Sequence, residues 1–170
     1  MRKLLRKFFF AVNKSLLRES ILQQLQAELT LQANAAELSR DEATSEESRS
    51  ENKWDTHSQE AAYLAEGQAR LVAEIGASLE LYAALPFPEF GPEDPIALGA
   101  LVELDTGGEH FWYFLGPRAG GLELKVGGRD ILLLTPSAPL GRELIGKRAG
   151  EVVKSAGRGE PVVQRIVSVA

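Results

Sequence analysis

The sequence predicts an α+β protein in which a hairpin of two long helices precedes a small, mainly antiparallel sheet domain with one short helix. Residues 13–43 and 52–84 carry long helical patterns, and a short polar bend joins them. The chain is then interrupted by a run of prolines, at Pro86, Pro88, Pro92 and Pro95. After them, short apolar stretches alternate with pairs of glycines, as in sheets built from hairpins.

The composition is ordinary for a chain that builds a hydrophobic core, since 44% of the 170 residues are hydrophobic. The net charge of -5 argues against a general coat for nucleic acids, which favours basic surfaces. The absence of cysteine excludes disulfides and cysteine-ligated zinc, and it suits a reducing compartment. His57 and His110 are not spaced like the ligands of a metal site. We expect His57 to be an exposed residue of a helix and His110 to have a structural role.

Residues 1–12, MRKLLRKFFFAV, form a basic and apolar extension that mimics the start of a signal peptide. The apolar run Phe8–Val12 is short, and no small-residue cleavage site follows it. A frayed helix start, or an extension from an upstream start codon, is therefore favoured over a signal peptide or membrane anchor. No other segment approaches the ~18 apolar residues that span a bilayer.

The first helix is predicted over residues 13–43, where no glycine or proline interrupts the pattern. Its apolar positions recur at helical spacing, at Leu17, Ile21, Leu25, Leu29, Ala36 and Leu38. The second helix is predicted over residues 52–84, with Gly67 and Gly76 weakening but not breaking it. Its heptad-like positions are Leu64, Gln68, Leu71, Ile75 and Tyr82, with Ala61, Ala65 and Val72 alongside.

Thirty helical residues extend ~45 Å, and two such helices joined by a short bend form an antiparallel coiled coil. We therefore expect a free-standing coiled coil over residues 13–84, followed by a proline-rich linker over 85–95. In the remaining chain, strands are expected at Ile96–Asp105, His110–Leu115, Leu122–Val126, Ile131–Leu134 and Pro161–Val169, and a short helix at Pro139–Ile145.

The bend between the helices, residues 46–55, is rich in acids. Carboxylates at the end of a helical hairpin can reach a site that belongs to another molecule. The alternative is an ordinary solvated face, in which Asp55 complements the dipole of the second helix and Glu51 and Asn52 cap it.

Two segments resemble the Gre family of bacterial transcript-cleavage factors. Ala138–Val153, APLGRELIGKRAGEVV, is similar to the family's C-terminal signature, in which a Ser-Pro, a short helix, a Leu-Leu/Ile-Gly-Lys run and a Gly-Asp/Glu-x-Val follow in this order. Ala138 stands where the family usually has serine. Ser50-Glu51-Asn52, with the helix behind it, is similar to the start of the family's second coiled-coil helix. The resemblance covers roughly residues 14–170 and leaves residues 1–12 without a counterpart.

The resemblance implies an FKBP-like domain over residues 96–170 that docks at the rim of the secondary channel of RNA polymerase. It implies that the coiled coil enters the channel and presents its acidic tip to the polymerase active centre. The chain would be a cytoplasmic accessory factor, not an enzyme, without a cofactor of its own. It would act as a monomer, would contact nascent RNA and DNA only indirectly, and would have no membrane partner.

In the family, two tip acids help to hold a second magnesium ion while the polymerase cleaves backtracked RNA. Mg²⁺ commonly takes one or two protein carboxylates beside phosphate oxygens, and two-metal hydrolysis needs such an ion. The family's tip reads Gly-Asp-Leu-x-Glu-Asn, where this chain reads Glu47-Ser48-Arg49-Ser50-Glu51-Asn52. Glu51 keeps one acid, whereas Ser48 replaces the other with an uncharged hydroxyl.

We therefore predict Glu51 and Glu47 as the residues that assist catalysis and hold the transient magnesium ion, with Glu47 or, alternatively, Glu46 in place of the acid that is missing at Ser48. The alternative is a factor that competes for the channel or alters pausing without cleavage. A prolyl isomerase or chaperone, suggested by the FKBP-like fold alone, and a coiled-coil adaptor are the competing functions, although fold does not carry function.

Overall fold

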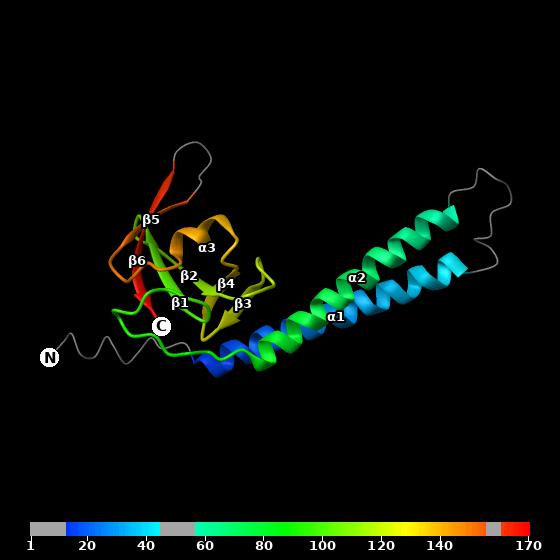
Figure 1. Cartoon of the computed structure of the whole chain (residues 1–170), viewed down its shortest axis with the longest axis horizontal. Helices are drawn as coiled ribbons and strands as arrows, with labels where there is room; N and C mark the ends of the chain where they lie inside the picture. The colour runs from blue at the N-terminus through cyan, green and yellow to red at the C-terminus, as the bar shows by residue number, and fades with distance from the viewer. Residues whose placement is uncertain (1–12, 45–56, 156–160) are drawn as a thin grey trace. The chain divides into compact units, whose positions relative to one another are not determined.

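The computed structural model describes residues 13–44, 57–155 and 161–170 (Figure 1). The chain divides into two units. One unit is Leu22–Ala84, which we call the helical unit, and the other combines Met1–Ile21 with Leu85–Ala170 and is called the sheet unit. The helical unit is thus inserted into the chain of the sheet unit. The predicted α+β class, with two long helices before a sheet, is confirmed.

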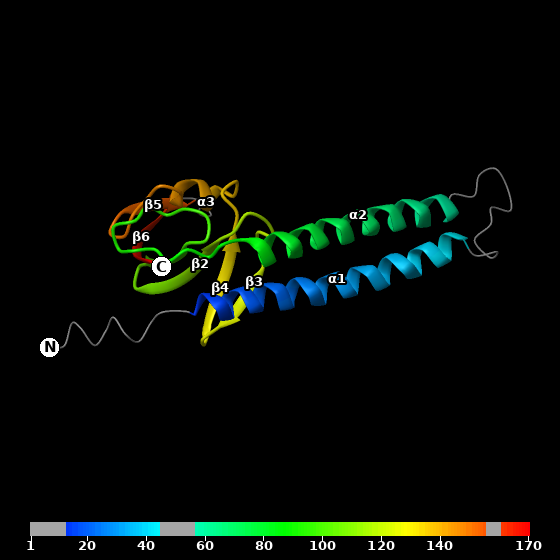
Figure 2. The ribbon, with the colours of Figure 1, turned by 60° about the horizontal axis from the view of Figure 1, so that its bottom comes forward.

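Two long helices, α1 (Lys14–Thr44) and α2 (His57–Ala84), form where the sequence predicts them. Helix α1 begins after Asn13, whose Oδ1 accepts a hydrogen bond from the backbone N–H of Ser15 at 2.8 Å. An asparagine at this position satisfies one of the free N–H groups of the first turn. From Leu22 onward α1 runs antiparallel beside α2, as Figures 1 and 2 both show.

One stripe on each helix of the helical unit is buried. Its buried members are Leu25, Ala36 and Ser39 on α1 and Ile75, Ser78 and Tyr82 on α2. The half-buried residues Leu29, Gln32, Ala65, Gln68 and Val72 continue the same stripes. We call these positions the seam.

Three residues that the sequence assigns to the seam lie outside it. Leu38, Leu64 and Leu71 are 71%, 55% and 37% exposed, so this part of the prediction is wrong. The reason is that apolar residues stand at neighbouring positions, for example Leu64 with Ala65 and Leu71 with Val72. Two helical phases one residue apart therefore fit the same pattern.

The sheet has six strands, namely β1 (Leu101–Thr106), β2 (Glu109–Leu115), β3 (Glu123–Val126), β4 (Arg129–Leu134), β5 (Val152–Ser155) and β6 (Val162–Val169). They lie in the order β3-β4-β2-β1-β6-β5. Among the strand pairs of the described residues, only β2–β4 is parallel, so the sheet is mainly antiparallel as predicted. The short helix α3 (Pro139–Leu144) forms between β4 and β5.

Two strands differ from the prediction. β1 begins at Leu101 rather than Ile96, because Ile96 exchanges hydrogen bonds with the loop after α3: its N–H donates to the carbonyl of Lys147 at 2.7 Å and its carbonyl accepts from Gly146 at 2.8 Å. A turn with Gly99 at φ 87° separates Ile96 from the strand. The four-residue strand β5, which the sequence did not predict, pairs with β6.

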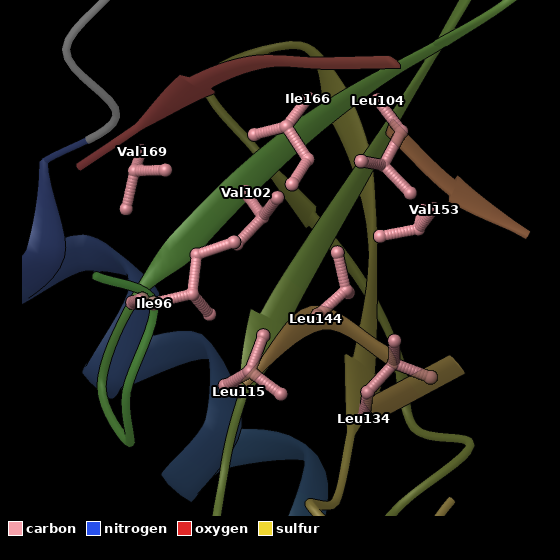
Figure 3. Packing of buried hydrophobic residues seen from close by; sticks show 10 residues of the cluster. Ile96, Val102, Leu104, Leu115, Leu134, Leu144, Val153, Ile166 and Val169 are labelled. Atoms are coloured by element: carbon pink, nitrogen blue, oxygen red, sulfur yellow. The ribbon is translucent and has the colours of Figure 1, made fainter. Parts of the chain in front are cut away.

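Both faces of the sheet carry buried side chains. On one face, Leu144 of α3 joins a core cluster of Ile96, Ala100, Val102, Leu104, Leu115, Leu134, Val153, Ile166 and Val169 (Figure 3). On the other face, Leu101, Phe114 and Leu133 are buried. The ring of Phe87, from the linker, lies 5.0 Å from the ring of Phe114, so the linker covers part of this second face.

Two basic residues fasten the start of α1 to the linker. The buried Lys14 Nζ donates to the carbonyls of Pro88 and Gly99, the latter at 3.4 Å, and lies 4.9 Å from the centre of the Phe90 ring. Burial lowers the pKa of Lys14, although the nearby carboxylate of Glu89 acts in the opposite direction. One turn later, Arg18 likewise donates to a linker carbonyl, that of Leu85, and lies over a linker ring, that of Phe87.

Candidate functional site

The predicted tip site lies outside the described residues. Glu46, Glu47, Ser48 and Glu51 all fall within 45–56, as do Arg49, Asn52, Trp54 and Asp55. The structure describes the helices on either side, with α1 ending at Thr44 and α2 beginning at His57. The catalytic and magnesium-binding roles of Glu47 and Glu51 stay predictions. Within residues 13–44, 57–155 and 161–170, no group of three or more His, Cys, Asp or Glu side chains could hold a metal ion.

The family-like segment 138–153 begins with the short helix α3. Ala138 precedes it with φ -65° and ψ 149°, an extended conformation typical of an N-cap residue, and Pro139 opens the helix. The methyl side chain of Ala138 provides no hydrogen bond to the first turn. Gly141, one turn on, lies so close to the backbone carbonyl of Thr135 that a Cβ atom there would collide with it. The glycine of this segment is therefore required for α3 to pack against the end of β4.

The loop after α3 is held by its own residues. Gly146 and Gly150 have φ values of 81° and 90°, which favour glycine. The Glu151 carboxylate accepts a hydrogen bond from the backbone N–H of Arg148 at 2.7 Å and another from Lys147 Nζ at 3.3 Å. The Arg148 N–H and the Lys147 ammonium lower the pKa of Glu151, because both favour its charged form. Much of the sequence signature is thus explained by the conformation of this loop.

An exposed patch remains on α3 and the loop. Ile145 is 40% exposed, Arg142 and Arg148 are exposed three residues before and after it, and the half-buried Lys147 follows it by two residues. Arg148 Nε donates to the carbonyl of Glu93 at 3.0 Å, which fixes the arginine against the linker. We call Arg142, Ile145, Lys147 and Arg148 the α3 surface. An apolar residue among three cations is suited to contact a partner with an acidic rim. Ile145 is not among the site residues that the sequence predicts, and its place in the Leu-Ile-Gly run is the signal that could have indicated it.

The described histidine has a structural contact. His110 Nδ1 lies 2.9 Å from Glu103 Oε1, and the Ser168 hydroxyl donates to Glu103 Oε2 at 2.8 Å. These three side chains link β2, β1 and β6. His57 is the first residue of α2, and its side chain is outside what the structure describes.

The aromatic run of β2 alternates between the faces of the sheet. Phe114 is fully buried and Phe111 is 41% exposed. Between them, Trp112 is half-buried beneath the Arg129 guanidinium, which lies 4.4 Å from its ring centre. Packing within the sheet therefore accounts for these aromatic residues.

Among the helices of the described residues, none is both long and apolar enough to cross a membrane.

Comparison with known proteins gives no matching family model and no matching curated protein. Among solved structures, the chain is similar to GreA factor homolog 1 (Gfh1) of Thermus thermophilus, with 20% identity and a TM-score of 0.37 over 88% of this chain and 94% of that chain. It is similar to Gfh1 of Thermus aquaticus, with 19% identity and a TM-score of 0.39 over 89% and 94% of the two chains. It is also similar to a transcription elongation factor GreA/GreB from Nitrosomonas europaea, with 21% identity and a TM-score of 0.38 over 61% and 79%.

Proposed function

We propose that this chain is a Gre-like transcription elongation factor whose partner is RNA polymerase. The observation that carries the proposal is the order of its parts: a helical hairpin with an acid-rich bend precedes the six strands in the chain, and the family-like segment 138–153 lies among those strands. The chain acts as a cytoplasmic accessory factor that modulates the polymerase's own activity.

The α3 surface is the proposed contact with the polymerase. Ile145 supplies an exposed apolar residue, and the cations of Arg142, Lys147 and Arg148 lie within three residues of it in sequence. The backbone beneath is held in place by the close packing of Gly141 against Thr135 and by the hydrogen bond from the Arg148 N–H to Glu151. A preformed surface of this kind binds without the entropic cost of ordering a loop.

The hairpin is the proposed means of reaching the polymerase active centre. Its bend, residues 46–55, enters the secondary channel and presents Glu51 and Glu47 to a magnesium ion shared with the polymerase. Ser48 carries no negative charge where the family has an aspartate, and Arg49 beside it adds a positive charge. Cleavage is therefore weaker than in a factor with two tip acids, while occupation of the channel still affects elongation and pausing.

Binding can be tested with the full chain and purified bacterial core RNA polymerase. We expect wild type to bind and Ile145→Asp to bind at least tenfold more weakly. Leu98→Asp is the matched control, because Leu98 is 42% exposed in the sheet unit but lies outside the α3 surface. Equal binding of both variants would reject this surface, and no association of wild type would reject the proposed function.

The cleavage role needs a separate experiment on backtracked elongation complexes. We expect wild type to shorten the RNA faster than polymerase alone, Glu51→Ala to abolish that gain, and Ser48→Asp to increase it. A polymerase-binding chain without any gain would favour the alternative in which the bend alters pausing only.

A further inference from the structure

Four leucines of the helical unit are exposed although their helices have a buried seam. Leu31 and Leu38 of α1 are 66% and 71% exposed, and Leu64 and Leu71 of α2 are 55% and 37% exposed. We call these four residues the leucine strip. Exposures of this size on four leucines amount to roughly 400 Å² of apolar surface, which is in the range of the largest patches on monomers, and such patches are often functional.

The four leucines share one face of the hairpin. On each helix the two leucines are seven residues apart, which returns them to the same side. Each also stands one residue before a seam position, as Leu38 does before Ser39 and Leu64 before Ala65. The rotation from the seam is therefore about 100° in the same sense on both helices. Since the helices are antiparallel, equal rotations place both pairs on the same face.

The leucines also match in height along the hairpin. Leu38 lies six residues before the end of α1 at Thr44, and Leu64 lies seven residues after the start of α2 at His57. Leu31 and Leu71 are thirteen and fourteen residues from the same two ends. The ends of α1 and α2 run side by side in both views of the chain (Figures 1 and 2). The strip is thus two leucines wide, with its two rows ~10 Å apart.

The seam beside the strip is poor in large apolar residues. It contains Gln32, Ala36, Ser39, Ala65, Gln68 and Val72 in this stretch, and the buried Oε1 of Gln68 has no hydrogen-bond partner. A hairpin that was complete by itself would place leucine in the seam and glutamine outside it. The reverse arrangement indicates that the strip is covered by another body.

We propose that a second copy of this chain covers the leucine strip. A closed dimer needs a surface that is complementary to itself, and the strip meets this condition because its two leucine rows are alike. Two arrangements meet this condition. If the two-fold axis is perpendicular to the hairpins, the hairpins run antiparallel and Leu31 of one copy lies on Leu38 of the other. If the axis is parallel to the hairpins, Leu31 of one copy lies on Leu71 of the other. Two strips of roughly 400 Å² supply the apolar centre of a standard interface, whose total area is ~1,200–2,000 Å². The product is a four-helix bundle.

Charge makes this association weak and reversible. The helical unit is acidic, since its sequence over residues 22–44 and 57–84 has Glu28, Glu37, Asp41, Glu42, Glu60, Glu66, Glu74 and Glu80 against Arg40 and Arg70. Two copies repel one another, and salt screens this repulsion while leaving the leucine contact intact. A foreign basic partner on the same strip would show the opposite dependence on salt.

The proposal is tested by sedimentation equilibrium of the full chain alone, across the micromolar range and at low and high salt. We expect the mean mass to rise with concentration toward two copies and the dimer to strengthen with salt. Leu38→Gln with Leu64→Gln should weaken the dimer at least tenfold, since glutamine keeps the helix but removes the apolar contact. Tyr63→Gln is the matched control: Tyr63 is 72% exposed and neighbours Leu64 but points about 100° away from it.

The proposal is overturned if wild type is monomeric throughout, if the double variant dimerises as well as wild type, or if salt dissociates the dimer. Circular dichroism of each variant shows whether its helices are retained. No polymerase enters this experiment, so its outcome is independent of the proposed function. The family resemblance implies a monomer, and the leucine strip is the reason to expect a monomer–dimer equilibrium instead.

Discussion

Arg18 and Leu85 are joined directly: Nη2 of Arg18 donates a hydrogen bond to the Leu85 carbonyl oxygen at 2.7 Å. The same guanidinium lies 4.6 Å from the ring centre of Phe87. Leu85 follows the last residue of α2, and that helix has no basic residue in its last turn. Arg18 thus supplies a cation where the dipole of α2 favours one. It also connects the two chain segments that make up the sheet unit.

Replacing Arg18 with methionine should therefore destabilise the chain. Methionine retains apolar volume but loses the charged hydrogen bond, which is worth about 1.5–3 kcal/mol. The free energy of unfolding in urea measures this loss. Arg70→Met is the matched control, because Arg70 forms only an exposed pair with Glu66 at 3.2 Å, and it should change stability by less than ~0.5 kcal/mol. Equal losses in the two variants would contradict the role given to Arg18.

Lys14→Met should lower stability at neutral pH by about 1–3 kcal/mol, since the Pro88 and Gly99 carbonyls lose a charged donor. The variant should also change the pH dependence. Burial lowers the pKa of Lys14 from 10.5, so between the lowered value and 10.5 the unfolded chain binds more protons than the folded chain. Stability contributed by this group therefore rises with pH in that window.

Denaturant unfolding at a series of alkaline pH values tests this sign. The difference in stability between wild type and Lys14→Met should grow as pH rises, since only wild type has this group. Other groups that titrate in the same range, such as the half-buried Tyr113, are common to both proteins and cancel in the difference. A difference that is constant or shrinks with pH would contradict the prediction.

Ala138→Ser should stabilise α3. Ala138 already has the extended backbone of an N-cap residue but no side-chain oxygen to bind the first turn. Serine at such a position is worth about 0.5–2 kcal/mol relative to alanine. Thermal unfolding should show a higher melting temperature for the variant, and an unchanged or lower one would mean that the serine hydroxyl does not reach the first turn.

Two glycine substitutions should have opposite effects. Gly141→Ala places a methyl group against the backbone of Thr135, which cannot give way as a flexible side chain would, and should cost about 3 kcal/mol or more. Gly76→Ala, inside α2, meets nothing within 4 Å and should stabilise by about 0.5–1 kcal/mol. Urea unfolding of both variants gives the two signs, and a tolerated Gly141→Ala would show that α3 can shift away from β4.

The long elements were predictable because their signals repeat. Helices α1 and α2 extend over about thirty residues each, and Gly67 and Gly76 did not interrupt the second. The choice of seam was not predictable, because Leu64 and Ala65 fit two phases equally well. Side-chain packing decided between these phases, and a pattern of apolar letters does not contain that information.

Short elements depend on contacts that are distant in sequence. Ile96 has the apolar character of a strand residue, yet its hydrogen bonds go to Gly146 and Lys147, fifty residues later. The strand β5 has four residues and forms because β6 lies beside it. At the tip, Glu47 and Glu51 rest on the family resemblance alone, since they fall within residues 45–56.

Because Leu22–Ala84 is inserted into the chain of the sheet unit, the length of the hairpin and the structure of the α3 surface can change independently, by evolution or by design. Adding seven residues to each helix would lengthen the hairpin by ~10 Å and keep the phase of the seam, while the sheet and its α3 surface stay unaltered. The length of the hairpin can therefore change in steps of seven residues per helix without any change to the α3 surface.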